Sequence, residues 1–197
     1  RLTARGDHTM QYLIDQVRVF RARAAAHTLH LAGLTQPHRP RAMLISCSDA
    51  RVVPALLTAA RPGDLFELRT YGGVIPPYDA QTPTGESRTI EYAVNELTVS
   101  DIIVCGHSHC DVVTAAMHDS LTASGITESA DDPAPLTGDV TAAGYWHVLK
   151  QLDVLSNYPC LVPRLADRSL YLHAWFHEID TGATLAHHPR ASTFLPL

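Results

Sequence analysis

The sequence predicts an α/β fold in which a central, mostly parallel β-sheet is flanked by helices. Short apolar segments alternate along the chain with segments of helical periodicity, an order typical of a parallel sheet. Residues 102–104 form a β-branched apolar run, which suits a strand covered on both faces. The chain has 197 residues, of which 46% are hydrophobic and 18% charged. This is long and apolar enough for one domain with its own core.

Composition also excludes several classes of protein. The net charge of −5 gives no basic surface for nucleic acid. No stretch approaches the ~18 apolar residues of a membrane span, and no targeting segment is recognisable at the amino terminus. The four cysteines are few and unevenly placed, so we expect reduced, metal-binding thiols rather than a disulfide framework. Cytoplasmic residence is therefore expected.

The first segment is predicted to be helical. Apolar residues recur with nearly helical spacing through residues 9–34, which indicates one helix or two in tandem. Pro37 and Pro40 end this segment. We therefore divide the chain into an amino-terminal helical arm, residues 1–40, and an α/β domain, residues 41–197.

The rest of the chain alternates between strands and helices. Strands are expected at residues 41–46, 65–69, 102–105, 170–179 and 184–186. Helices are expected from residue 54 and over residues 87–97 and 145–155. Residues 120–144 are polar and contain Pro and Gly, so a surface loop with a short helix is predicted there.

Potential metal ligands follow two of these strands. Cys47 ends the strand 41–46, and His107 and Cys110 follow the strand 102–105. If a helix starts near Ser108, the His107 imidazole and the Cys110 thiol can point towards one ion. Parallel strands present their carboxyl ends on one side of a sheet, so Cys47 could join them there. Such a Cys₂His set leaves one tetrahedral position open for water, which favours a catalytic zinc site.

Two motifs resemble those of the β-class carbonic anhydrases. Residues 47–51, Cys-Ser-Asp-Ala-Arg, resemble the family's Cys-x-Asp-x-Arg motif, and residues 105–110, Cys-Gly-His-Ser-His-Cys, resemble its Cys-Gly-His-x-x-Cys stretch. Their separation also fits. Residues 172–176 and 180–182 add further similarity, so the resemblance extends from about residue 41 to the end.

The resemblance implies a zinc enzyme. One Zn²⁺ per subunit would be held by Cys47, His107 and Cys110, with Asp49 and Arg51 as a catalytic pair. Members of the family are homodimers or dimers of dimers, which implies that the helical arm packs on a partner subunit. The implied reaction is the reversible hydration of carbon dioxide to bicarbonate and a proton by zinc-bound hydroxide. Neither nucleic acid nor a membrane is an expected partner.

Asp49 and Arg51 have a physical role in this reaction. A site with two thiolates acidifies bound water less than an all-histidine site, so a helper group is needed. Asp49, held ionised by Arg51, can accept a hydrogen bond from the attacking oxygen. Asp49 could also occupy the open zinc position itself. That state would open as pH rises, and activity would increase with it.

The sequence departs from the family beside the expected substrate pocket. Thr70, Tyr71, Gly72 and Gly73 stand where the family usually has Asn-Ala-Gly-Asn, and Tyr71 would narrow the pocket or offer a hydroxyl. Asp111 replaces a usual glycine and brings negative charge close to zinc, which would weaken bicarbonate binding or slow hydroxide attack through repulsion.

Alternative interpretations exist for several residues. The three ligand candidates could be core thiols and a core histidine, and Asp49 with Arg51 could be a surface ion pair. Cys105 is interpreted as strand core, Cys160 as structural, and His109 as an exposed loop residue rather than a proton shuttle. For the whole chain, the alternatives are a zinc hydrolase of carbon disulfide or carbonyl sulfide, and a catalytically silent dimeric zinc protein.

Overall fold

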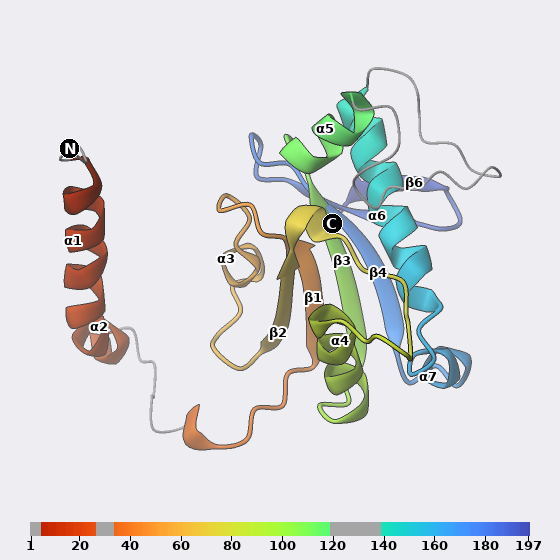
Figure 1. Cartoon of the computed structure of the whole chain (residues 1–197), viewed down its shortest axis with the longest axis horizontal. Helices are drawn as coiled ribbons and strands as arrows, with labels where there is room; N and C mark the ends of the chain where they lie inside the picture. Colours follow the sequence, from red (N-terminus) through yellow and green to blue (C-terminus); the bar gives the residue numbers. More distant parts are fainter. Residues whose placement is uncertain (1–4, 27–33, 119–138) are drawn as a thin grey trace. The chain divides into compact units, whose positions relative to one another are not determined.

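The computed structural model describes residues 5–26, 34–118 and 139–197 (Figure 1). Contacts within the chain form two units, residues 1–38 and residues 39–197. Each unit is described by itself. The part of the predicted loop that spans residues 120–138 lies outside the described residues.

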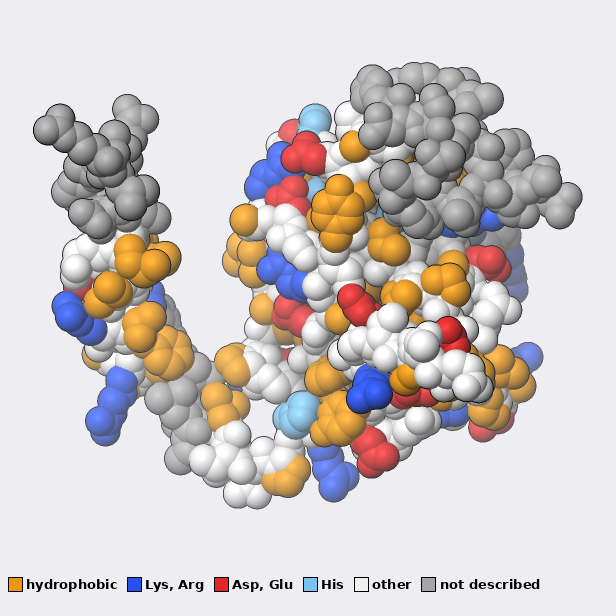
Figure 2. Space-filling model, in the orientation of Figure 1, with side chains coloured by type: hydrophobic (Ala, Val, Ile, Leu, Met, Phe, Trp, Pro, Cys, Tyr) orange, Lys and Arg blue, Asp and Glu red, His pale blue; other side chains and the backbone are white. Residues whose placement is uncertain are grey.

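The first unit contains two helices in tandem, α1 (Arg5–Arg18) and α2 (Phe20–Ala26). This decides between the two alternatives that the periodicity of residues 9–34 left open. The predicted extension of the segment falls partly on residues 27–33, which are not described. Apolar side chains, among them Leu13 and Val17, are exposed along α1 (Figure 2).

A six-stranded sheet forms the centre of the second unit, in the order β2-β1-β3-β4-β5-β6. The strands are β1 (Ala42–Cys47), β2 (Leu65–Thr70), β3 (Asp101–His107), β4 (Tyr171–His177), β5 (Thr184–His188) and β6 (Thr193–Pro196). Strands β2, β1, β3 and β4 are mutually parallel, whereas β5 and β6 are added antiparallel. The predicted, mostly parallel sheet is confirmed, and β6 is an addition that the sequence did not indicate.

Helices flank this sheet as predicted. They are α3 (Pro54–Thr58), η2 (Tyr71–Gly73), α4 (Gly85–Asn95), α5 (Asp111–His118), α6 (Val140–Ser156) and α7 (Val162–Ala166). Within the described part of the chain, no helix is long and apolar enough to cross a membrane.

The predicted start of α6 at residue 145 was wrong, because α6 begins at Val140. The Asp139 carboxylate accepts hydrogen bonds from the Thr141 and Ala142 amides and so caps the first turn. Gly144 indicated a loop in the sequence but lies inside the helix. A Cβ atom on Gly144 would lie 2.7 Å from the Phe176 ring, so this glycine allows α6 to approach the sheet.

The two faces of the sheet carry separate apolar clusters. One face places Ile45, Val104 and Phe176 in the main core, and α6 packs against β3 and β4. Leu44 and Ile103 point to the opposite face and form a smaller cluster with Cys105. Alternation along β1 and β3 therefore buries both sides of these strands, which explains their continuous apolar sequence.

Gly106 is expected to be intolerant of a side chain. A Cβ atom there would lie 2.3 Å from Val148 of α6 and 3.3 Å from Phe176. We expect Gly106→Ala to lower the free energy of unfolding by about 1–3 kcal/mol through overpacking. Urea denaturation at fixed protein concentration measures this. Gly85→Ala is the matched control because no atom lies within 4 Å of the added Cβ. Equal stability of the two variants would contradict the packing argument.

Candidate metal centre

The carboxyl ends of two neighbouring strands bring the candidate ligands together. Cys47 ends β1 and His107 ends β3, and these strands pair in parallel so that Ser46 lies opposite Cys105. Cys110 follows after a short turn. One ligand atom from each of Cys47, His107 and Cys110 lies within 4.8 Å of the others, and all three residues are buried. Their convergence across about sixty residues of sequence is the central feature of the site.

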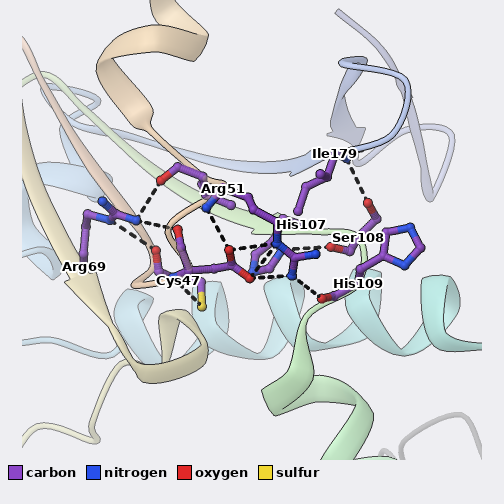
Figure 3. A network of polar contacts seen from close by, with 9 residues as sticks. Cys47, Arg51, Arg69, His107, Ser108, His109 and Ile179 are labelled. Atoms are coloured by element: carbon purple, nitrogen blue, oxygen red, sulfur yellow. Dashed lines mark hydrogen bonds and ion pairs between the residues drawn. The ribbon is translucent and has the colours of Figure 1, made fainter. Parts of the chain in front are cut away.

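A turn, and not yet a helix, follows β3. Helix α5 begins at Asp111 rather than near Ser108, so Cys110 precedes the helix. The Ser108 amide donates to the His177 carbonyl. The Ser108 hydroxyl accepts from the Ile179 amide, as Figure 3 shows. These two bonds to the β4 strand and its following residues fix the turn that positions Cys110.

The His107 imidazole is oriented as a metal ligand. Its Nδ1 lies 2.8 Å from the Ser108 carbonyl oxygen and must donate to it, because a carbonyl is only an acceptor. The lone pair is therefore on Nε2, which is buried without a hydrogen-bond partner. A hydrogen bond at one ring nitrogen commonly fixes the tautomer of a metal-bound histidine. The orphaned Nε2 atom is what a cation held with two thiols would satisfy.

Electrostatics at the three residues also suit a cation. Burial lowers the pKa of His107, so its imidazole is neutral at ordinary pH. Burial, with the neighbouring Cys47 thiol, raises the pKa of Cys110. The raised pKa favours the protonated thiol of Cys110 as long as no cation is bound. A divalent cation would favour the thiolate instead and would bind two thiolates and the neutral imidazole. The donor set of two sulfurs and one nitrogen fits zinc.

The other two cysteines lie elsewhere. Cys105 belongs to the small apolar cluster on the opposite face of the sheet, and burial raises its pKa to about 12. Cys160 packs against the main core and is outside the ligand cluster. The interpretation of Cys105 as strand core agrees with this placement.

Asp49 and Arg51 form a close ion pair next to Cys47. The Asp49 carboxylate accepts from the Arg51 amide at 2.9 Å, from Nε at 3.0 Å and from Nη2 at 2.6 Å. These bonds hold the pKa of Asp49 well below its usual range. The Asp49 amide also lies 3.4 Å from the Cys47 sulfur, as a donor to it. The pair is therefore attached to the ligand cluster.

Arg51 further connects two parts of the site. Its Nη2 donates to the His109 carbonyl at 2.9 Å, across to the turn that carries His107 and Cys110. His109 adopts a left-handed backbone conformation, its side chain is exposed, and Figure 3 shows its ring turned away from Arg51. In this structure His109 contributes its carbonyl oxygen, and the exposed ring agrees with the loop interpretation.

Arg69 was not recognised from the sequence as part of the site. From the end of β2, its Nη2 donates to the carbonyls of Asp49 and Val52, both at 2.7 Å, and its Nε to that of Cys47 at 3.3 Å (Figure 3). It thereby clamps the backbone that carries Cys47 and Asp49. The signal that could have indicated Arg69 is its position, because it is a positively charged side chain near the carboxyl end of the strand next to β1.

The predicted pocket residues lie around the cluster in different ways. The Thr70 hydroxyl is occupied by a hydrogen bond to the Val74 carbonyl. Tyr71 is 68% exposed, whereas Gly72 and Gly73 are buried within η2. Asp111 is exposed at the start of α5. The hydrogen bond to Asp49 is the main cause that raises the pKa of Arg51, and the charge of Asp111 adds to it. Their contact with substrate stays a prediction.

Comparisons with known proteins agree with this geometry. A family model described as carbonic anhydrase matches residues 42–184. A carbonic anhydrase of Pseudomonas aeruginosa is 38% identical, over 73% of this chain and 71% of that relative. Another, from Synechocystis sp., is 35% identical over 90% of this chain and 71% of that relative.

Solved structures show the same fold. The β-carbonic anhydrase CcaA matches with a TM-score of 0.80 and 31% identity, over 96% of this chain and 100% of that chain. A tetrameric β-carbonic anhydrase from Sordaria macrospora, 24% identical, matches with a TM-score of 0.74 over 91% of this chain and 96% of that chain. The chain described here therefore belongs to the β-class carbonic anhydrase family.

Proposed function

We propose that the chain catalyses the reversible hydration of carbon dioxide to bicarbonate and a proton, with one Zn²⁺ per subunit held by Cys47, His107 and Cys110. The observation that carries this proposal is the convergence of the three ligand atoms within 4.8 Å, with the Nε2 atom of His107 left unpartnered. Three protein ligands leave a fourth tetrahedral position for water, as catalytic zinc sites do. Family membership supports the same reaction.

The protein side of the reaction is assigned to Asp49 and Arg51. A zinc ion held by Cys47, His107 and Cys110 would supply a Lewis acid that acidifies a bound water molecule. Asp49 accepts a hydrogen bond from the attacking oxygen and orients its lone pair towards carbon dioxide. Arg51 keeps Asp49 ionised and fixes the direction of its carboxylate through two side-chain nitrogens. Asp49 can either ligate zinc or stay bonded to Arg51 and act on the substrate. The hydrogen bonds from Arg51 favour the second state.

The decisive experiment combines activity with metal content on one sample. Stopped-flow hydration of carbon dioxide should show rapid turnover in purified, reduced protein that carries one zinc per chain. The same sample should be assayed with carbonyl sulfide and carbon disulfide. Turnover of these alone would support the alternative hydrolase, and full zinc occupancy without any turnover would support a catalytically silent zinc protein. Protein that carries no zinc would overturn the metal site itself.

We also propose a homodimer or dimer of dimers in which α1 and α2 pack on a partner subunit. The exposed apolar side chains along α1 support this arrangement, as does the tetrameric state of the Sordaria macrospora relative. Analytical ultracentrifugation of the whole chain tests it, and a monomer at micromolar concentration would contradict it. All four cysteines are unpaired, which suits the reducing cytoplasm as the proposed location.

A further inference from the structure

The short helix η2, residues Tyr71–Gly73, lies among all the ligand-bearing segments. It contacts β1, which ends in Cys47, β3, which ends in His107, and α5, which follows Cys110. In Figure 1, η2 and α5 lie at the same end of the sheet. The backbone of η2 therefore lies against each of the elements that end in, or follow, a candidate ligand.

The packing of η2 leaves no room for a side chain on Gly72 and brings Gly73 close to the Cys47 backbone. A Cβ atom on Gly73 would lie 3.4 Å from the Cys47 amide nitrogen, and one on Gly72 would lie 2.6 Å from Val112 Cγ1. Both glycines have positive φ, 66° for Gly72 and 71° for Gly73. The position of this backbone therefore helps to set the separation between the end of β1 and the start of α5.

A buried histidine of α6 holds this backbone. His147 is 3% exposed, and its Nε2 lies 2.9 Å from the Gly72 carbonyl oxygen. The carbonyl can only accept, so Nε2 carries the proton. Burial lowers the pKa of His147, so the imidazole is neutral. Its Nδ1 atom is buried without a partner, which costs folding free energy. An apolar side chain of similar size would fill the space without this cost, so packing alone does not explain a histidine at this position.

The other hydrogen bonds near η2 do not replace this one. The Val74 amide donates to the Tyr71 carbonyl within the turn itself, and Thr70 donates to Val74 beside it. Gln151, one turn further along α6, accepts from the Ile75 amide, beyond the two glycines. His147 thus attaches Gly72, the central residue of η2, to helix α6. Gly72 is also the residue that lies against Val112.

We propose that His147 is a positioning residue of the metal centre. Its Nε2–H holds the Gly72 carbonyl, which keeps η2 against Cys47 and Val112 and sets the spacing of the Cys47 and Cys110 sulfurs. Through this spacing His147 controls how tightly the cation is held and the geometry of its open position. The inference rests on the proposed zinc site and assigns to it a residue that does not touch the metal.

The test measures zinc affinity in the whole, zinc-loaded protein by competition with a chromophoric chelator. His147→Met and His147→Leu remove the donor, whereas His147→Gln keeps an N–H group at a similar distance from the backbone. We expect the Met and Leu variants to bind zinc about 10-fold more weakly or worse, the range typical of residues that orient metal ligands. The Gln variant should recover affinity to within about threefold of the parent chain.

Tyr158→Phe is the matched structural control. The Tyr158 hydroxyl also donates to the backbone of the segment after η2, 2.6 Å from the Pro76 carbonyl, but away from the ligand segments. It should lower the melting temperature and leave zinc affinity unchanged. The visible spectrum of the Co²⁺-substituted protein gives a second measurement, and the Met and Leu variants should change it while Tyr158→Phe does not.

Different results would overturn the positioning role of His147 and the zinc site itself. If the parent chain binds zinc and folded His147→Met and His147→Leu bind it equally well, the positioning role is wrong and the zinc site stands. If Tyr158→Phe weakened zinc binding as much as His147→Met does, the positioning role would also be overturned. Such a result would mean that zinc affinity reflects the general stability of the fold. A parent chain that holds no zinc would overturn the metal site and, with it, this inference.

Discussion

Cys110→Ser is expected to abolish both metal binding and carbon dioxide hydration. The Cys110 sulfur lies within 4.8 Å of the other two ligand atoms, in a buried cluster where a hydroxyl cannot replace a thiolate as a zinc ligand. Two remaining ligands should not retain the ion through gel filtration. Zinc per chain, measured by atomic emission, should fall from about one to near zero, and hydration should fall to the uncatalysed rate.

Cys105→Ala is the matched control for this loss. Cys105 is a buried thiol on the same strand as His107, but it belongs to the apolar cluster on the other face of the sheet. The variant should lose about 1 kcal/mol of stability, since it removes a small buried group, and keep a full complement of zinc. Loss of zinc from Cys105→Ala alone would mean that the wrong thiol has been assigned.

Asp49→Asn is expected to lower kcat/KM for hydration by about 10²-fold or more while zinc stays bound. The amide keeps the shape of the carboxylate but removes the charge that Arg51 holds and that would orient the attacking oxygen. Because Arg51 keeps the pKa of Asp49 well below its usual range, the carboxylate is ionised at pH 6 and at pH 9. The loss relative to the parent chain should therefore be similar at both pH values.

Asp101→Asn provides the control for this second prediction. Asp101 begins the strand that ends in His107, and its carboxylate lies 2.8 Å from the His173 imidazole. Its replacement removes a comparable polar contact at the opposite end of β3 and should change kcat/KM by less than about twofold. An Asp49→Asn variant as active as Asp101→Asn would show that the Asp49 carboxylate takes no part in the reaction.

A change of coordination with pH would appear in the same variant series. X-ray absorption at the zinc edge should give two sulfurs, one nitrogen and one solvent oxygen at every pH if Asp49 remains with Arg51. Scattering from a carboxylate carbon at low pH that is absent from Asp49→Asn would instead show that Asp49 moves onto the metal. The Arg51 hydrogen bonds to Asp49 favour the first result.

Local pattern by itself determined the strands other than β6, and much of the metal site. The apolar runs before Cys47 and before His107 predict buried parallel strands, and parallel strands necessarily end on one side of a sheet. The convergence of Cys47, His107 and Cys110 follows from that rule, and the structure brings their ligand atoms together. The ligand set of the metal site depends on residue type and strand direction, and it can therefore be predicted from the sequence.

The tertiary structure decided everything that depends on contacts between distant segments. Arg69 clamps backbone carbonyls 17 to 22 residues away, and His147 bonds to Gly72 across 75 residues. The acceptors of Arg69 and His147 are all backbone carbonyl oxygens. Every residue has one, so the sequence cannot indicate which of them is used. Gly144 likewise suggested a loop and proved to be where α6 meets Phe176. Ligand identity depends on local chemistry, whereas the rigidity of the ligands depends on packing that only the folded chain creates.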